Sequence, residues 1–444
     1  MPKLNIVIVG GSLGGLCTGL ALKQLGHDVT ILERNPDNLL HNQGAGIVAG
    51  GDTLEFFKRY DRCSRSFAVS SQKRLYLDRD ANVVHRVDMV QNMTSWDLSY
   101  YMLRANFDGV KSDYCDVPPV HPDDGKAVHL HGHKVIGLED EGDQVNVTFE
   151  KSNGERGSIK GDVVVGADGP NSTVRSLLVR NVERTYAGYC ALRGTVPEDE
   201  ATDAAREAFQ ERFTFFHGPG IQILAYTIPG PNGAVEKGKR LLNFVYYTNF
   251  PAESLDKPDG PLKEILTDVD GMPHRITLPP GKINPAVWEK RKNIARENLP
   301  RPFADLVCAT KKPFVQAITD VISPENEFMG GKVVLIGDAL AGFRPHTVAS
   351  TSQAAFDAMI LADMLEGKIS RKEWKLQTMC YARTIQKRGV DMGNRSQFGD
   401  LPLEEHIKDR DRASKPRREE VWPEWAKAGL EDIPTPSDAT EPRL

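Results

Sequence analysis

Glycines and a single acid near the start of the chain have the types and spacing that bind a phosphate. Gly10-Gly11-Ser12-Leu13-Gly14-Gly15 follows an apolar, β-branched run at 4–9, and Glu33 follows a second such run at 29–32. Apolar residues recur at helical spacing between the two runs, so the segment predicts a strand, a glycine turn, a helix and a second strand. The free N–H groups at the N-terminus of such a helix bind a pyrophosphate.

The glycine pattern matches the dinucleotide-binding fingerprint at two of its three positions. Gly10 suits the tight turn and Gly15 the close packing of helix on strand, but Ser12 stands where a glycine lets the backbone approach the phosphate. Glu33 restores the fingerprint, because an acid about 20 residues on accepts a hydrogen bond from a ribose 2′-OH. It favours FAD or NAD: Arg34 alone would suit a 2′-phosphate, but Glu33 would repel one. The alternative is an ordinary buried strand-helix-strand unit with a glycine turn.

Two more acid-bearing turns follow apolar runs farther along the chain. Asp168-Gly169 comes after the run 163–165, and Gly337-Asp338 ends a run that begins at 332. An acid in a glycine turn at the carboxyl edge of a sheet is a usual ligand position. The alternative for Asp168 is that its carboxylate caps its own turn. The loop at 43–47, which holds Ala45 and Gly46, either lets backbone approach a ligand or merely turns the chain.

Hydrophobic periodicity predicts the elements that position these turns. Ser95 is expected to cap a helix with Asp97 in its first turn. Charged and proline-rich loops at 257–292 are expected to cover part of a second sheet. The predicted helices span 53–60, 95–107, 351–366 and 379–388, and the predicted strands include the hairpins 74–87 and 133–150 and the antiparallel neighbours 213–216, 221–228 and 241–247.

The order of these segments indicates a discontinuous first domain with a second domain inserted into it. Phosphate-binding, acid-turn and Gly-Asp segments lie in three separated parts of the chain, so a Rossmann-like α/β domain is predicted from 1–180 and 315–400. The aromatic-rich stretch 181–314 predicts an α+β domain with an antiparallel sheet, joined by a short segment near 70–92. The charged tail 401–444 is expected to be partly disordered.

Composition points to a protein that acts on small molecules. The net charge of −5 leaves no basic footprint for nucleic acid, and no apolar run approaches the ~20 residues of a membrane span. The six cysteines are far apart and form no C-x-x-C, so neither a disulfide framework nor a metal site is expected. Because Leu4 already belongs to the fold, no signal peptide is expected, and the protein is predicted to be cytoplasmic.

Taken together, the three turn motifs resemble a known enzyme family. The Gly10–Gly15 motif, the Asp168-Gly169 turn within DxxxGADGxxSxVR, and Gly337-Asp338 with Pro345 seven residues after the acid resemble the single-component FAD-dependent aromatic hydroxylases of the 4-hydroxybenzoate hydroxylase superfamily. Within it, the segments 186–198, 241–247 and 344–346 look most similar to the 2,6-dihydroxypyridine 3-monooxygenase-like branch. The similarity covers about residues 4–365.

The resemblance implies a tightly but non-covalently bound FAD. It places the ADP half on the glycine turn, with the adenosine ribose on Glu33, the flavin beside Ala45-Gly46, and the ribityl chain on Asp338. It associates Asp168 with both FAD and NAD(P)H. The implied FAD residues are Gly10, Gly11, Ser12, Leu13, Gly14, Gly15, Glu33, Arg34, Ala45, Gly46, Asp168, Gly337, Asp338 and Pro345.

Two departures from the family pattern affect these assignments. Many relatives have an arginine that opens the helix near Ser95-Trp96 and contacts the cofactor, and this chain has none there. Relatives also often carry a glycine-rich turn where this chain has Val348-Ala349-Ser350-Thr351, so FAD docking at that helix is expected to differ in detail.

The resemblance also implies a reaction. The chain has only one dinucleotide fingerprint, so a second Rossmann domain for NAD(P)H is not expected. In the family that the chain resembles, NAD(P)H binds transiently, reduces the flavin and leaves, and O₂ then forms a flavin C4a-hydroperoxide, which implies hydroxylation of a phenolic or N-heteroaromatic small molecule. A base near neutral pKa would deprotonate the substrate hydroxyl. The catalytic candidates are His217, Tyr226 and His346, with Tyr246 as a further polar group and Arg344 either binding a carboxylate or anchoring its loop. A surface histidine and a core tyrosine are the alternatives for these residues.

Several alternatives remain open. Epoxidation, decarboxylative hydroxylation and halogenation occur on the same fold, and a non-catalytic dinucleotide-binding protein is a second class. The sequence does not separate NADH from NADPH or a monomer from a homodimer.

Overall fold

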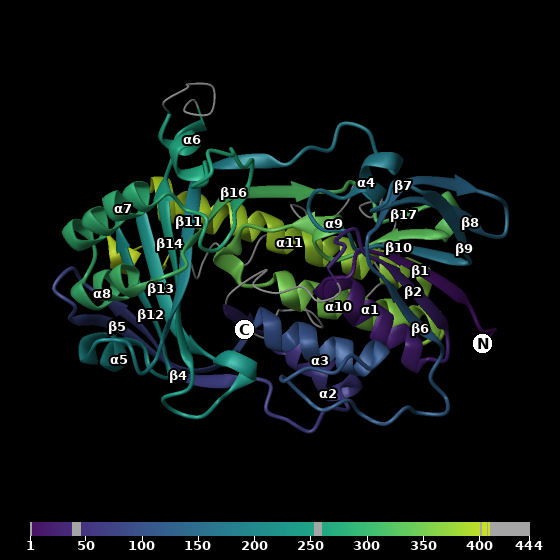
Figure 1. The fold of residues 1–444 in the computed structure, drawn as a ribbon, viewed down its shortest axis with the longest axis horizontal. Coiled ribbons are helices and arrows are strands. Elements are labelled where there is room, and N and C mark those ends of the chain that lie inside the picture. Colours follow the sequence, from purple (N-terminus) through teal and green to yellow (C-terminus); the bar gives the residue numbers. More distant parts are fainter. Residues whose placement is uncertain (1, 38–45, 253–259, 400–401, 406, 409–444) are drawn as a thin grey trace.

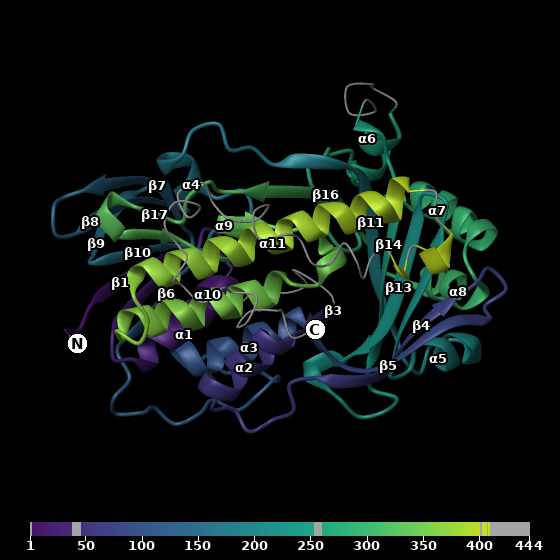
Figure 2. The same ribbon diagram turned by 180° about the vertical axis from the view of Figure 1, so that it is seen from behind.

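The computed structural model describes residues 2–37, 46–252, 260–399, 402–405 and 407–408, and it shows two lobes side by side (Figure 1). One lobe is built on a mostly parallel sheet close to the N-terminus, and the other on a large, mostly antiparallel sheet that contains one parallel pair of strands. A long helix, α11 (Arg371–Phe398), runs along both lobes (Figure 2). Among the described helices, none is long and apolar enough to cross a membrane.

The first sheet has six strands in the order β17-β18-β10-β1-β2-β6. Neighbours pair in parallel except β17, which joins the edge antiparallel. Its central strands are buried Val and Ile runs, as expected of parallel strands covered on both faces. The helices α1, α3 and α10 pack on one side, and the three-stranded sheet β7-β8-β9 packs on the other (Figure 1). The bounds are β1 (Asn5–Val9), β2 (Asp28–Leu32), β6 (Ala127–Leu130), β10 (Val163–Gly166), β17 (Glu327–Phe328), β18 (Val333–Leu335), β7 (His133–Asp140), β8 (Val145–Lys151), β9 (Arg156–Gly161), α1 (Leu13–Gln24), α3 (Trp96–Asp108) and α10 (Ser350–Leu365).

The second sheet has ten strands, and its main path runs β15-β16-β11-β14-β13-β12-β4-β5-β3, with β19 paired to β16. Helices α5, α7 and α8 cover one face, which forms one hydrophobic core (Figure 1). The other face is rich in aromatic side chains and forms a separate core. The bounds are β15 (Thr277–Leu278), β16 (Phe314–Ile322), β11 (Thr185–Pro197), β14 (Leu241–Asn249), β13 (Ile221–Ile228), β12 (Arg212–Gly218), β4 (Val69–Leu77), β5 (Val83–Ser95), β3 (Gly46–Ala49), β19 (Ala341–Gly342), α5 (Asp203–Phe209), α7 (Pro285–Asn298) and α8 (Arg301–Ala309).

This architecture confirms the expected fold class, a Rossmann-like α/β sheet combined with an antiparallel sheet. Both predicted hairpins are present as β4-β5 and β7-β8, and β12, β13 and β14 are antiparallel neighbours. The predicted helix cap is also present, because the Ser95 hydroxyl accepts a hydrogen bond from the Leu98 N–H at 3.2 Å. The antiparallel sheet takes strands from 46–95 and from 314–322 as well as from 185–249, and the division into domains stays a prediction.

Three local predictions were incomplete or had the wrong bounds. Gly46 opens strand β3, which pairs with β5, so this part of the 43–47 loop is ordered by a distant partner; Ala45 lies outside the described residues. The segment 257–292 contains helix α6 (Pro261–Leu266) and half of α7 rather than loops alone. The last helix begins at Arg371, not 379, because Ser370 and Glu373 form a capping box there. Most of the predicted tail 401–444 lies outside the described residues.

Candidate active site

The glycine turn after β1 is held by close backbone contacts. Gly10 has φ +105°, and a Cβ atom there would lie 2.5 Å from the carbonyl oxygen of Ala167. A Cβ atom on Gly15 would lie 1.9 Å from the carbonyl oxygen of Gly10. Ser12 instead has extended backbone angles as the residue before α1, so a non-glycine residue fits without strain. The turn therefore keeps glycine at the two positions where the fold requires it.

Glu33 buttresses this turn. One carboxylate oxygen accepts the Gly11 N–H at 2.7 Å and the other accepts the Asn35 N–H at 2.8 Å. The side chain is buried, yet it forms part of the wall of a cavity. Each carboxylate oxygen has a second lone pair, so Glu33 can still accept a hydrogen bond from a ligand hydroxyl.

Two adjoining cavities extend from the glycine turn toward the second lobe. Their volumes are about 560 Å³ and 320 Å³, and they share wall residues that include Ser12, Trp96 and Gln316. The first is also lined by cationic residues from four separate segments, namely Arg34, Lys134, Arg184 and Arg275. Together the cavities form a continuous cleft between the two sheets, suited to an elongated, negatively charged ligand.

The Asp168 carboxylate caps the N-terminus of a helix, although Asp168 also lines the first cavity. The carboxylate accepts hydrogen bonds from the Ser172 hydroxyl and from the Thr173 and Val174 N–H groups, the last two at 2.6 and 3.2 Å. These donors open α4 (Thr173–Leu178). Burial raises the pKa of Asp168, and the three hydrogen bonds oppose that rise. The backbone of 167–170 still lines the first cavity, so this segment meets a ligand mainly through its main chain.

The Gly337-Asp338 turn reaches the second cavity. It opens the short helix α9 (Gly337–Leu340), with Gly337 at φ +54°. The Gly337 N–H donates to the buried Asp357 carboxyl group at 2.8 Å, and the Gln353 amide donates to the Gly337 carbonyl at 3.0 Å. Burial raises the pKa of Asp338 to about 6, with Arg184 acting in the opposite direction. The turn is thus fixed from behind while Asp338 faces the cavity.

Most of the residues expected to hold the cofactor meet at this cleft. Gly11 and Gly15 lie behind the turn and support it, and Pro345 opens the 3₁₀ turn η4 (Pro345–Thr347) without lining either cavity. Ala45 lies outside the described residues. The predicted residues that line one or both cavities are Gly10, Ser12, Leu13, Gly14, Glu33, Arg34, Gly46, Asp168, Gly337 and Asp338.

Sequence reasoning missed four prominent side chains of the cleft. Trp96, the first residue of α3, lines both cavities and stacks on Tyr100 with ring centroids 4.8 Å apart. Arg184 and Gln316 come from segments without a motif, so no sequence signal marked them. Arg193 lies within the segment 186–198 that carried the resemblance, and only its place in the fold shows that it reaches the second cavity.

Arg193 and Tyr226 lie where the second cavity meets the aromatic face of the antiparallel sheet. A Cβ atom at Gly46 would lie 2.6 Å from the Tyr226 ring and 2.8 Å from its hydroxyl oxygen, so the backbone of β3 approaches this ring closely. The Arg193 guanidinium donates to the Gly46 carbonyl at 3.4 Å and lies over the Phe314 ring, 5.4 Å from its centroid. Burial raises the pKa of Tyr226 to about 12, and Arg193 opposes that rise.

Neither histidine candidate, His217 or His346, lines the cavity beside Arg193. His346 is buried one layer deeper, with its Nε2 3.0 Å from the Tyr189 hydroxyl and its ring stacked on Tyr247 at 4.3 Å. His217 lies on β12 beside Tyr76 and lines a separate cavity of about 860 Å³. Their catalytic roles stay predictions, as does that of Tyr226.

The two remaining polar candidates have structural partners. Tyr246 faces the helix-covered core on the opposite side of the sheet. Arg344 pairs with Asp320 at 2.6 Å and donates to the Asn394 side chain at 2.7 Å, which favours the anchoring alternative.

Comparisons with known proteins agree with this geometry. A family model described as FAD binding domain-like matches residues 186–320. The chain is 29% identical over 402 residues to a 2,6-dihydroxypyridine 3-monooxygenase from Paenarthrobacter nicotinovorans, covering 89% of this chain and 92% of the relative.

Solved structures extend the similarity to the fold. The structure of 2,6-dihydroxypyridine-3-hydroxylase from Arthrobacter nicotinovorans superposes with a TM-score of 0.76 at 27% identity, covering 90% of this chain and 94% of that one. Klebsiella pneumoniae HpxO complexed with FAD and uric acid shares the fold at 17% identity, with a TM-score of 0.65 and 94% of each chain covered. With its glycine turn, two-sheet cleft and aromatic face, the chain belongs to the FAD-dependent aromatic hydroxylase family and is an FAD-dependent monooxygenase.

Proposed function

We propose that this enzyme uses NAD(P)H and O₂ to hydroxylate a small phenolic or N-heteroaromatic ring, with a hydroxypyridine as the first substrate class to test. The observation that carries the proposal is the half-buried Arg193 side chain, which lies beside Gly46 and Tyr226 where the cleft meets the aromatic face. A planar apolar wall with one cation at its edge suits a flat ring that bears an ionisable hydroxyl.

The cleft fits FAD at each of its chemically distinct parts. The N-terminus of α1, beside the tight Gly10 turn, would bind the pyrophosphate, and Glu33 would accept from the adenosine ribose. Asp338 would hold the ribityl hydroxyls, and Gly46 leaves room for the flavin edge against Tyr226. When bound, FAD supplies the redox chemistry, accepting hydride from NAD(P)H and activating O₂ for transfer of one oxygen atom.

The missing helix-opening arginine has a candidate replacement. Arg184 lines the first cavity and is electrostatically coupled to Asp338 across the cleft. Its guanidinium is held by the Thr319 hydroxyl and by the Asn171 amide oxygen, at 3.0 and 3.1 Å. Both partners are neutral, so its positive charge stays available for a phosphate.

The protein's own groups orient the substrate and favour its ionised form. Arg193 stabilises a phenolate or hydroxypyridinolate, which lowers the pKa of the bound hydroxyl. Tyr226 hydrogen-bonds the same oxygen or its neighbour, and the buried aromatic face excludes water. The His346–Tyr189 pair lies behind the Tyr247 ring, which stacks on His346, so we assign it to supporting the aromatic face rather than to direct contact with the substrate.

The proposal is tested by spectroscopy and coupled turnover. Purified protein should show flavin absorption bands, and NAD(P)H oxidation should be stimulated by one member of a panel of hydroxypyridines, phenols and hydroxyquinolines. Hydroxylated product and released hydrogen peroxide are measured separately, because peroxide alone would mark a compound as an effector. A protein that stays colourless after reconstitution with FAD, or that oxidises NAD(P)H without product from any compound, would contradict the proposal.

The role of Arg193 is tested with the variant Arg193→Gln. Losing a charge-assisted hydrogen bond of about 1.5–3 kcal/mol corresponds to a fall of about 10- to 150-fold in kcat/KM for Arg193→Gln. Arg86→Gln is the matched control, because Arg86 is half exposed on β5 and pairs only with the exposed Asp88 among the ion pairs of the described residues. Equal kcat/KM values in the two variants would contradict the assignment.

A further inference from the structure

We propose that Cys63 and Cys115 are a peroxide-sensitive thiol pair that closes into a reversible disulfide. The two residues are 52 positions apart in the sequence and form no motif, yet their Sγ atoms lie 3.8 Å apart. At this distance the sulfur atoms form a weak S–H···S hydrogen bond, and formation of a disulfide requires them to approach by about 1.8 Å. Each thiol is half-buried, which leaves access for an oxidant as small as peroxide.

The surroundings of the pair allow this movement. Cys63 follows helix α2 (Gly51–Tyr60) and Cys115 follows α3, and neither lies within a helix or a named strand. The Cys115 Sγ contacts the Tyr101 carbonyl at 3.8 Å, and the Asn106 amide donates to the Cys63 Sγ at 3.2 Å. These are weak contacts of sulfur, and loop backbone can adjust without breaking a helix or sheet ladder.

The two sulfur atoms are chemically distinct. The Cys63 thiol donates toward Cys115, which lowers the pKa of Cys115, and the Arg65 cation acts in the same direction. The hydrogen bond to Cys115 and burial raise the pKa of Cys63. Burial, Asp61 and Asp116 oppose the lowering at Cys115. Within the proposal we assign the attacking thiolate to Cys115 and the resolving thiol to Cys63, and the single variants below test this assignment.

The proposed reaction balances with hydrogen peroxide as the only oxidant. The Cys115 thiolate attacks one peroxide oxygen, which breaks the O–O bond, releases hydroxide and forms a sulfenic acid. The Cys63 sulfur then attacks the sulfenic sulfur, forms the S–S bond and expels water. The two thiols supply the two electrons that peroxide accepts. An FAD-dependent monooxygenase is itself a source of peroxide whenever oxygen is reduced without hydroxylation.

The disulfide would close the part of the chain that passes from one lobe to the other and back. Residues 63–115 include β4 and β5 of the antiparallel sheet and α3 of the parallel-sheet lobe. Near its start, Arg65 donates to the carbonyl groups of Asn232 at 3.1 Å and of Gly233, in the connection between β13 and β14. Oxidation would thus cross-link the two ends of segment 63–115, next to the contact of Arg65 with Asn232 and Gly233.

The experiment uses the full-length FAD-loaded protein and added hydrogen peroxide, so it does not depend on the identity of the substrate. We expect the protein to lose two of its six thiols and to yield one cross-linked peptide pair, Cys63 with Cys115, with a mass lower by two hydrogen atoms. Dithiothreitol should restore both thiols. No cross-link after peroxide treatment, or a cross-link to another cysteine, would overturn the proposal.

Single variants separate the roles of the two thiols. In Cys63→Ser, a sulfenic acid should persist at Cys115 and react with dimedone, whereas Cys115→Ser should give neither a cross-link nor dimedone labelling. Cys308→Ser is the matched control, because Cys308 is the other half-buried cysteine and should leave the cross-link unchanged. Equal dimedone labelling of Cys63 and Cys115 in the two variants would overturn the assigned roles, and peptide mapping of the wild type tests the pairing without any substitution.

Discussion

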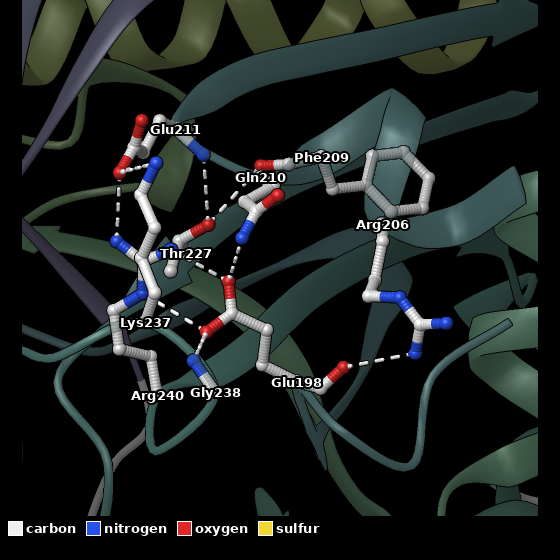
Figure 3. Close-up of polar contacts among 9 residues, drawn as sticks. All are labelled: Glu198, Arg206, Phe209, Gln210, Glu211, Thr227, Lys237, Gly238 and Arg240. Atoms are coloured by element: carbon white, nitrogen blue, oxygen red, sulfur yellow. Dashed lines mark hydrogen bonds and ion pairs between the residues drawn. The ribbon is translucent and has the colours of Figure 1, made fainter. Parts of the chain in front are cut away.

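Replacing Glu198 with alanine should destabilise the antiparallel-sheet lobe more than any surface substitution. Glu198 follows β11, and its carboxylate accepts from Arg240 at 2.6 and 3.0 Å, from the Gly238 N–H at 2.7 Å and from the Gln210 amide at 2.7 Å (Figure 3). The side chains of Glu198 and Arg240 are only 1% and 3% exposed. The pair joins the end of β11 to the start of β14, and these two strands are antiparallel neighbours at the centre of the sheet.

The magnitude follows from the charge that the substitution leaves behind. Removing one partner of a buried ion pair costs about 3–5 kcal/mol, because the other charge stays buried without compensation. Arg240 keeps a second partner, Glu211, at 3.0 Å, and that carboxylate is 35% exposed. Since a partly solvated partner compensates only in part, we expect Glu198→Ala to lower the free energy of unfolding by about 3 kcal/mol.

The assay is equilibrium urea unfolding of the apoprotein, followed by tryptophan fluorescence and circular dichroism. Glu200→Ala is the control, because Glu200 is 46% exposed in a surface pair with Lys311 and should change stability by less than about 0.5 kcal/mol. The double variant Glu198→Leu with Arg240→Met removes both charges and should recover most of the loss. A loss below about 1 kcal/mol, or a double variant no more stable than Glu198→Ala, would refute the reasoning.

The same pair makes a prediction about acid stability. Burial raises the pKa of Glu198, but the hydrogen bonds from Arg240, Gly238 and Gln210 outweigh it, and the net pKa lies below the ordinary 4.5. A lowered folded-state pKa means that this stabilisation is present above pH 4.5 and is lost as the pH falls below it. Urea midpoints of the wild type should therefore fall more steeply in acid than those of Glu198→Gln, and parallel profiles would contradict this.

Three further predictions concern the cleft. Gly46→Ala should weaken FAD binding, measured by flavin fluorescence, because the new Cβ atom would lie 2.6 Å from Tyr226, whereas Gly137→Ala, with its nearest neighbour at 3.6 Å, should not. In the wild type, FAD affinity should decline below about pH 6, because the Asp338 carboxylate of the apoprotein becomes protonated there and accepts fewer hydrogen bonds. Asp338→Asn should remove this decline. Because burial raises the pKa of Asp357 to about 8, folding favours its protonated form, and the thermal stability of the wild type should fall as the pH rises from about 4 toward 8. Asp357→Asn should flatten that fall, and an unchanged slope would show that Asp357 is not responsible.

Local patterns in the sequence were sufficient for the elements whose partners are near in the chain. The packing of Gly15 on the Gly10 carbonyl, the Ser95 cap and the hairpin β7-β8 each depend on residues close together in the chain, so propensity and spacing decide them. The family resemblance, carried by motifs in a constant order, extended this to the fold class and to the enzyme class.

Contacts between distant segments decided the rest. Strand β3 forms only because β5 provides a ladder for Gly46, and α11 lies along both lobes with buried residues on several sides, so it has no single apolar stripe to mark its length. Whether Asp168 caps a helix or faces a ligand depended on the positions of the α4 N–H groups. The places of Arg193 at the cleft and of Cys115 beside Cys63 are likewise tertiary facts. The sequence by itself determined which chemistry the chain carries, and the tertiary structure decided which side chains meet to perform it, because spacing along a chain constrains only near neighbours.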